Sequence, residues 1–232
     1  MKSLDALCFG AHPDDVELTS GGLAARLAGD GHAVGIVDLT RGELASRGDP
    51  ALREREAQAA AVALGVSLRR TLALPDGGLD RRDPAQLKAV VECLREHRPR
   101  LVVAPDRHDE HPDHIEASCL VARACYLSGL ARYPADGERH RPARVLFALY
   151  RHGPEPDVVV DVSAVWARRM VALHAHASQL DPAAGPGTYL TAPGFLGEVE
   201  ARARAWGARA GVEFGEGYRV RGPLPVLDPS AR

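Results

Sequence analysis

Two short segments of this chain concentrate histidines and carboxylates at close spacing. One is GAHPDDVE at residues 10–17, and the other is DRHDEHPDH at residues 106–114. Together they offer six candidate functional side chains: His12, Asp14, Asp15, His111, Asp113 and His114. Two imidazoles, one carboxylate and an open coordination position form a known catalytic zinc site, whereas structural zinc sites usually contain cysteine. Neither segment contains a cysteine, so the residue types predict a catalytic metal centre.

The adjacent acids Asp14 and Asp15 are difficult to explain by a structural role alone. Enclosed carboxylates repel one another or need partners. On an irregular loop, however, one of them can face a metal while its neighbour faces the water on that metal. The structural alternatives are an acidic turn that caps the next helix, and a solvated loop in which Asp113 is a helix N-cap. The occurrence of both segments at the ends of strands favours the functional interpretation.

The rest of the sequence contains no competing catalytic pattern. A GxSxG nucleophile elbow and a Walker phosphate loop are both missing. Gly21 and Gly22 follow the first segment, but no GxGxxG does, which argues against a dinucleotide site. His174 and His176 are two apart on a predicted helix and would face different directions, so they form a poor metal pair.

The remaining sequence alternates short apolar runs with helical patterns. Strands are predicted at residues 4–10, 33–39, 71–74, 101–104, 145–150 and 158–162. Helices are predicted at residues 23–27, 52–64, 86–97, 113–130, 163–180 and 196–210. This alternation predicts a single α/β domain over residues 1–232, a doubly wound and mainly parallel sheet with helices on both faces.

The fold explains how two distant segments could form one site. In a doubly wound sheet of order 3-2-1-4-5, the first and fourth strands are neighbours, and ligands bind beyond their carboxyl ends. The first cluster follows the strand at residues 4–10, and the second follows the strand at residues 101–104. We therefore expect the two clusters to meet in one cleft.

Composition limits the classes of function. The 232 residues carry 29 Lys and Arg against 31 Asp and Glu, so there is no bulk positive charge for nucleic acid or an anionic membrane. The longest uncharged run, residues 182–197, is broken by prolines and glycines and cannot be a membrane helix. No signal peptide is evident. Cys8 and Cys93 lie in apolar patterns that indicate buried thiols, and we expect a cytoplasmic protein with reduced cysteines.

The two motifs resemble those of the PIG-L or LmbE-like family of zinc-dependent N-acetylglucosamine deacetylases. The family motif AHPDD, a variable residue and Glu stands at residues 11–17, and HPDH stands at residues 111–114. The chain looks most similar to the bacillithiol-pathway branch, which deacetylates N-acetylglucosaminyl-malate. Further matching stretches include DLTRGE at 38–43, LPDGGL at 74–79 and DVS at 161–163.

The resemblance implies an LmbE-like, Rossmann-like fold, one Zn²⁺ per subunit and a role for each motif residue. The metal ligands would be His12, Asp15 and His114. Asp14 would be the general base that activates water. His111, protonated and oriented by Asp113, would stabilise the oxyanion. The products would be acetate and a free glucosamine amine.

The resemblance also implies features outside the metal centre. Members of this branch are homo-oligomers, in particular hexamers, and act on a small amino-sugar conjugate. Arg41 and Arg53 would bind the two carboxylates of a malate aglycone. The sequence departs from the branch at Glu110, His176 and Leu180. These departures leave the metal chemistry intact and affect the expected contacts with malate or sugar.

Several alternatives remain open at this stage. The substrate could be another N-acetylglucosamine conjugate or a small N-acyl compound. The chain could be a non-catalytic metal-binding homologue or a nucleotide-binding α/β module. Iron(II), cobalt or manganese could occupy the same ligands in place of zinc.

Overall fold

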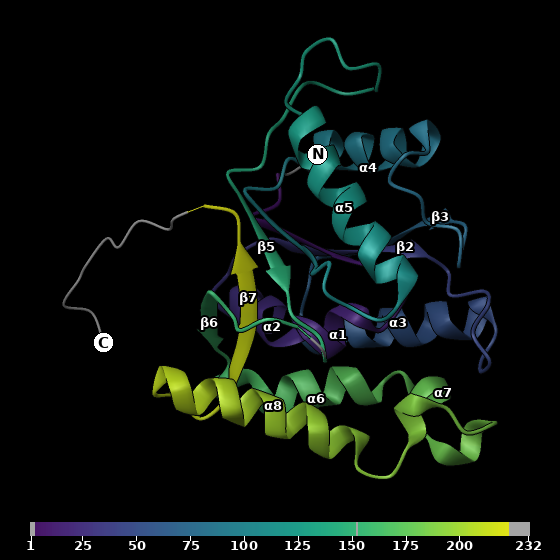
Figure 1. Cartoon of the computed structure of the whole chain (residues 1–232), viewed down its shortest axis with the longest axis vertical. Helices are drawn as coiled ribbons and strands as arrows, with labels where there is room; N and C mark the ends of the chain where they lie inside the picture. The colour runs from purple at the N-terminus through teal and green to yellow at the C-terminus, as the bar shows by residue number, and fades with distance from the viewer. Residues whose placement is uncertain (1–2, 152, 223–232) are drawn as a thin grey trace.

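A computed structural model describes residues 3–151 and 153–222 of the chain. They form a seven-stranded sheet of order β3-β2-β1-β4-β5-β7-β6 (Figure 1). The strands are β1 (Ala6–Gly10), β2 (Val34–Thr40), β3 (Leu68–Leu74), β4 (Leu101–Pro105), β5 (Arg144–Ala148), β6 (Val158–Asp161) and β7 (Gly215–Val220). Strands β1 to β5 are parallel, which confirms the predicted order 3-2-1-4-5.

Side chains alternate between the two faces of the sheet and bury a core on each. On one face, Leu7 and Phe9 of β1 pack with α4 (Pro84–His97) and α5 (Pro112–Leu127). On the other face, Ala6 and Cys8 pack with α2 (Gly21–Gly29), α3 (Pro50–Leu64) and α6 (Trp166–His174). Figure 1 shows these two helical layers. Apolar runs without alternation in β1, β2 and β4 are the sequence signature of this double burial, and the predicted α/β fold is confirmed.

The strand β7 was not predicted from the sequence. It pairs antiparallel with both β5 and β6 and so joins β6, the edge strand, to the rest of the sheet. Its sequence GEGYRV lacks an apolar run, and its two buried side chains are those of Glu216 and Tyr218. Glu216 is buried and accepts hydrogen bonds from the backbone N–H groups of Gly22 and Leu23, at 2.7 and 2.8 Å, in the first turn of α2. A carboxylate at a helix N-terminus therefore anchors this strand together with the Tyr218 ring, which is buried in the core.

The prediction of one continuous helix over residues 163–180 is wrong. The segment divides into a 3₁₀ turn, η1 (Ser163–Val165), then α6, then the short helix α7 (Ala177–Leu180). The chain turns at His176, which is fully buried, and the Ser178 side chain and N–H bond to the Glu56 carboxylate of α3. The break between α6 and α7 thus places polar groups of α7 against α3. The hydrophobic periodicity of the sequence could not indicate this break.

The remaining elements complete the frame. A five-residue helix, α1 (Asp15–Thr19), begins within the first motif and was not predicted. Helix α8 (Phe195–Ala210) packs on β6 and β7, and two 3₁₀ turns, η2 (Pro182–Ala184) and η3 (Tyr189–Thr191), lie between α7 and α8. Cys8 and Cys93 are buried, as predicted. No helix among the described residues combines the length and apolarity that a membrane crossing needs.

Candidate active site

The two predicted clusters meet at the carboxyl edge of the sheet. His12 and Asp15 follow β1, and His114 lies in the first turn of α5 after β4. The Nδ1 atom of His12 lies 3.5 Å from Asp15 Oδ2, and the Nε2 atom of His114 lies 3.2 Å from Asp15 Oδ1. The three side chains are nearly buried, so these ligand atoms converge in a small and largely enclosed space.

Two carboxylates hold the far side of the His12 ring. Its Nε2 atom lies 3.1 Å from Asp76 Oδ1 and 3.3 Å from Asp113 Oδ2. Asp113 is itself fixed, because its carboxylate accepts hydrogen bonds from the backbone N–H groups of Gly77 and Leu79. When the His12 ring is neutral, this arrangement places its proton on Nε2 and leaves Nδ1, on the Asp15 side, as a free electron pair.

Sequence reasoning missed Asp76 as a site residue. It follows β3, in the turn PDGG that was interpreted only as a strand-closing turn and a family match. The available signal was its position, since the carboxyl end of β3 lies at the same edge of the sheet as those of β1 and β4. Hydrogen bonding to His12 lowers the pKa of Asp76 to about 2.

His114 is oriented in the same way by Asp109. The Nδ1 atom of His114 lies 3.0 Å from Asp109 Oδ2, so Nε2 is turned toward Asp15. Asp109 belongs to the second histidine-rich segment but was not singled out from the sequence. Burial opposes the charged ring of His114, but Asp15 and Asp109 outweigh it and raise its pKa to about 10.

His111 and Asp113 are placed differently from the sequence expectation. The Asp113 carboxylate contacts His12, and the His111 ring is held by the backbone of Asp113 instead, whose N–H donates to His111 Nδ1 at 3.2 Å. His111, not Asp113, is the N-cap of α5. Burial lowers the pKa of His111, and the neighbouring rings of His114 and His12 lower it further. The expected pairing of an Asp113 carboxylate with a His111 imidazolium is therefore corrected.

Asp14 lies beside the converging ligands in an unusual backbone conformation. Its φ is 156°, a value that residues with a Cβ rarely adopt, and such outliers cluster at functional sites. Burial raises the pKa of Asp14; Arg53 opposes this, and the adjacent charge of Asp15 adds to it. A carboxylate whose pKa is raised is better suited to accept a proton and return it.

The two arginines proposed for substrate binding occupy different environments. Arg53 is buried, with Nη2 3.4 Å from Asp14 Oδ2 and Nη1 donating to the Gly42 carbonyl at 3.0 Å. Gly42 has a φ of +64°, and a Cβ there would overlap the Arg53 guanidinium, so this position requires glycine. Arg41 is exposed and is not among the residues that line the cavity.

A cavity of about 620 Å³ opens above these residues. Its polar floor holds His12, Asp14 and His114, and its walls include Leu44, Tyr150 and Tyr189. The Tyr150 ring meets the His114 ring edge to face at 6.0 Å. We call this cavity with its polar floor the cleft. Its volume lies within the range that small-molecule sites occupy.

A second charged cluster lies directly behind the cleft and is sealed from solvent. Arg69 forms a two-pronged ion pair with Asp38, at 2.9 and 3.0 Å, and also binds Glu17. The Nε2 atom of His176 lies 3.4 Å from Glu17 Oε2. We call these four residues the Glu17 network. His176, one of the departures seen in the sequence, is therefore a buried partner of the last residue of the first motif.

The donor set of the cleft fits a divalent metal ion. Ligand atoms of His12, His111 and His114 lie within 4.8 Å of one another, and the same holds for His12, Asp76 and Asp113. His12 and His114 each turn one ring nitrogen to a carboxylate and the other to Asp15, the usual arrangement around a metal-binding histidine. The acids also raise the pKa of both rings, which shows that this point favours a cation. Fold and site together define the class of α/β proteins with a candidate metal centre at the carboxyl edge of the sheet.

Comparison with known proteins agrees with this class. The family described as GlcNAc-PI de-N-acetylase, PIG-L, matches residues 7–125, just over half of the chain. This match shows that the chain belongs to the PIG-L family, as the two motifs predicted. Named family members are deacetylases, so the expected enzyme class, a hydrolase of N-acetyl groups, is confirmed.

Three relatives illustrate the similarity. The chain is 28% identical to a 1D-myo-inositol 2-acetamido-2-deoxy-alpha-D-glucopyranoside deacetylase from Rhodococcus opacus, over 91% of this chain and 99% of the relative. It is 30% identical to diacetylchitobiose deacetylase from Thermococcus kodakarensis, over 75% and 69%. The crystal structure of the conserved protein TT1542 from Thermus thermophilus superposes with a TM-score of 0.89 and 39% identity, over 99% of both chains.

Proposed function

We propose that this protein is a metal-dependent deacetylase of an N-acetylglucosamine conjugate, with zinc as the metal. The observation that carries the proposal is the convergence of His12, Asp15 and His114 beside Asp14 on the floor of the cleft. The named relatives support a conjugate of N-acetylglucosamine as the substrate class.

Within that class we propose N-acetylglucosaminyl-L-malate as the substrate, in cytoplasmic bacillithiol synthesis. This finer assignment rests on the resemblance of the sequence to that branch. Arg41 and Arg53 remain the proposed contacts for the malate carboxylates. Arg53 reaches the cleft directly, while Arg41 begins the exposed segment that carries Leu44 and Ala45 into the cleft wall.

The residues of the chain supply binding, orientation and proton transfer in this proposal. His12, Asp15 and His114 would hold zinc, which when bound polarises the acetyl carbonyl and a water molecule. Asp14 accepts the proton of the attacking water and later delivers it to the departing nitrogen as the carbon–nitrogen bond breaks. The oxygen of that water ends in acetate, and the amine leaves neutral.

His111 acts in this proposal as a neutral hydrogen-bond donor. Because its Nδ1 accepts from the Asp113 N–H, the ring proton of neutral His111 is on Nε2. That N–H can donate to the oxyanion that forms on the acetyl carbonyl. Removing one such donor typically slows an enzyme by about 100- to 1,000-fold.

The proposal is tested by measuring amine release from N-acetylglucosaminyl-malate, its inositol counterpart, diacetylchitobiose and free N-acetylglucosamine. Each is assayed with zinc-loaded protein, with chelator-stripped protein and with Asp14→Asn protein. We expect release that requires metal and Asp14 and is fastest for the malate conjugate. Equal rates on all conjugates would retain the chemistry and reject the malate assignment. No release by protein with stoichiometric zinc would favour a non-catalytic homologue.

We also propose that the active form is a homo-oligomer, and specifically the hexamer that the resemblance implies. Light scattering coupled to size exclusion would measure the mass of the assembly directly. A mass of one subunit across micromolar concentrations would reject the proposal. The metal is tested separately, by element analysis of protein purified without added metal.

A further inference from the structure

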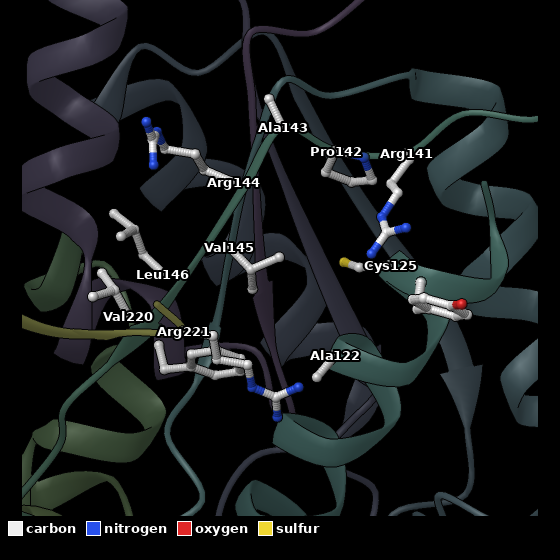
Figure 2. Close-up of a pocket in the computed structure, with 12 residues that line it drawn as sticks. Ala122, Cys125, Arg141, Pro142, Ala143, Arg144, Val145, Leu146, Val220 and Arg221 are labelled. Atoms are coloured by element: carbon white, nitrogen blue, oxygen red, sulfur yellow. The ribbon is translucent and has the colours of Figure 1, made fainter. Parts of the chain in front are cut away.

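A second cavity of about 290 Å³ lies at the amino end of β5 (Figure 2). It shares no lining residue with the cleft. Because β1, β4 and β5 are parallel, the amino end of β5 and the carboxyl ends of β1 and β4 lie at opposite edges of the sheet. The two cavities are therefore separate sites, and nothing in the deacetylase mechanism uses this one.

Two guanidinium groups face this cavity, and neither has an acidic partner in the part of the chain that the structure describes. The Arg141 guanidinium lies over the Tyr126 ring at 4.5 Å, and that of Arg221 lies over the Phe147 ring at 4.9 Å. Neither arginine forms an ion pair within residues 3–151 and 153–222. Contact with an aromatic face orients a guanidinium but leaves its N–H donors available. The cavity thus offers two positive groups with unused donors.

The wall that carries Arg141 is held in place although it has no regular secondary structure. The buried Arg95 side chain donates to the backbone carbonyls of Ser128, Leu130 and Ala135. The end of the segment is tied as well, because the Ala143 N–H donates to the Arg100 carbonyl at 2.9 Å. A site whose walls are already fixed loses little entropy when a ligand binds.

The aliphatic part of the Arg141 side chain is held in place as well. A Cβ on Gly129 would lie only 2.9 Å from the Arg141 Cβ, so the absence of a side chain at Gly129 is what lets Arg141 pack there. Burial raises the pKa of the neighbouring Cys125 thiol to about 12, although Arg221 and Arg141 both oppose this. The thiol is therefore neutral, and the floor formed with Ala122 and Val145 is apolar.

We propose that this cavity binds a small organic carboxylate with an apolar body. The carboxylate would pair with the guanidinium group of Arg141 or of Arg221, each of which matches its geometry, and the body would lie on the floor of Ala122, Cys125 and Val145. The volume is at the lower end of the range for small-molecule sites, which suits a ligand of about one ring. This inference does not depend on the deacetylase assignment.

Strand β5 offers a matched control. Val145 and Phe147 belong to the core on the α4 and α5 side, whereas Leu146 belongs to the opposite core. Alternation along the strand places Arg144 on the same side as Leu146. Figure 2 likewise draws the Arg144 side chain away from Arg141 and Arg221. An Arg144→Gln change removes an equal charge from another part of the cavity lining, on the side away from Arg141 and Arg221.

The test is calorimetric titration of the zinc-loaded full chain with benzoate. The double variant Arg141→Gln, Arg221→Gln should weaken binding by about tenfold or more, because each charge-assisted contact is lost. Arg144→Gln should stay within about twofold, because Arg144 lies on the other side of β5 from the proposed carboxylate. The variant Ala122→Phe keeps both arginines but fills the floor, and it should also lose binding. Both arginines are exposed, so unchanged amine release would verify that the double variant is folded.

Several results would overturn the proposal. Benzoate could bind the double variant as tightly as the unmodified protein, or neutral benzamide could bind as tightly as benzoate. Inorganic phosphate could compete with benzoate at equal affinity, which would indicate a site for any small anion. Binding that disappears in His114→Ala protein would belong to the metal centre. A change in the mass of the assembly in the double variant would show that another copy of the chain covers this surface.

Discussion

The cleft and the Glu17 network contain the same kinds of side chain and differ in how their charge is balanced. In the Glu17 network, Arg69 binds both carboxylates, and the side chains of Arg69, Asp38 and Glu17 are at most 1% exposed. In the cleft, Asp15, Asp76, Asp109 and Asp113 surround imidazoles, and Arg53 reaches only Asp14. Buried carboxylates that are paired with an arginine stabilise a fold. Carboxylates that have no such partner are suited to bind a cation.

Removal of a metal ligand should have the largest effect. His114→Ala deletes one of the converging nitrogens and leaves Asp15 without its ring partner. We expect loss of stoichiometric zinc and loss of amine release to background. His174→Ala is the matched control, since His174 is exposed on α6. Full zinc occupancy in His114→Ala protein would refute the ligand assignment.

Asp14→Asn should separate chemistry from metal binding. The amide keeps the shape of the side chain but cannot accept and return a proton. We expect zinc content to stay at the level of the unmodified protein while kcat falls by about 100- to 10,000-fold, the usual contribution of a general base. Near-normal kcat would mean that another group activates the water.

Breaking the Glu17 network should reduce stability rather than metal affinity. Arg69→Met leaves Glu17 and Asp38 buried without their cation, at a cost of about 3–5 kcal/mol in the free energy of unfolding. Denaturant unfolding with fixed zinc measures this. Arg70 lies on the same strand as Arg69 and forms a half-exposed ion pair with Glu96. Arg70→Met should therefore lower the free energy of unfolding by at most about 1 kcal/mol. Equal losses of unfolding free energy in the two variants would show that the buried pairing by Arg69 contributes no more than a surface ion pair.

Asp113→Asn tests which histidine Asp113 serves. The structure couples its carboxylate to His12, so we expect zinc affinity to fall by about 10- to 100-fold, as for other partners of metal-binding histidines. Asp80→Asn is the control, because Asp80 is exposed and distant from the His12 ring. Unchanged zinc affinity with a reduced kcat would instead support the sequence expectation that Asp113 acts through His111.

The pH dependence of stability should report the Glu17 network and is the smallest expected effect. Burial opposes ionisation of Glu17, but Arg69 and His176 outweigh it and lower its pKa from 4.5 to about 2. A lowered pKa gives stability that is present above about pH 4.5 and lost as the pH falls toward 2. The difference in unfolding free energy between unmodified and Glu17→Gln protein should therefore shrink over that range. A constant difference would show that Glu17 does not titrate between the two states.

Much of the fold could be predicted because apolar runs mark the buried parallel strands. The order of β3, β2, β1, β4 and β5 follows from the alternation of strands and helices. Strand β7 and the break at His176 were not predictable in the same way. Both depend on polar groups whose partners are far away in sequence, such as Glu216 with Gly22 and Ser178 with Glu56.

The sequence by itself determined the chemistry that is available. Two motifs at the ends of neighbouring strands specified histidines and acids, because parallel strands bring their carboxyl ends to one edge. Only the tertiary structure decided which group faces which. It turned Asp113 to His12, added Asp76 and Asp109 behind the rings, and closed Glu17 with Arg69. Such pairings depend on side-chain directions across the sheet, which spacing along the chain does not encode.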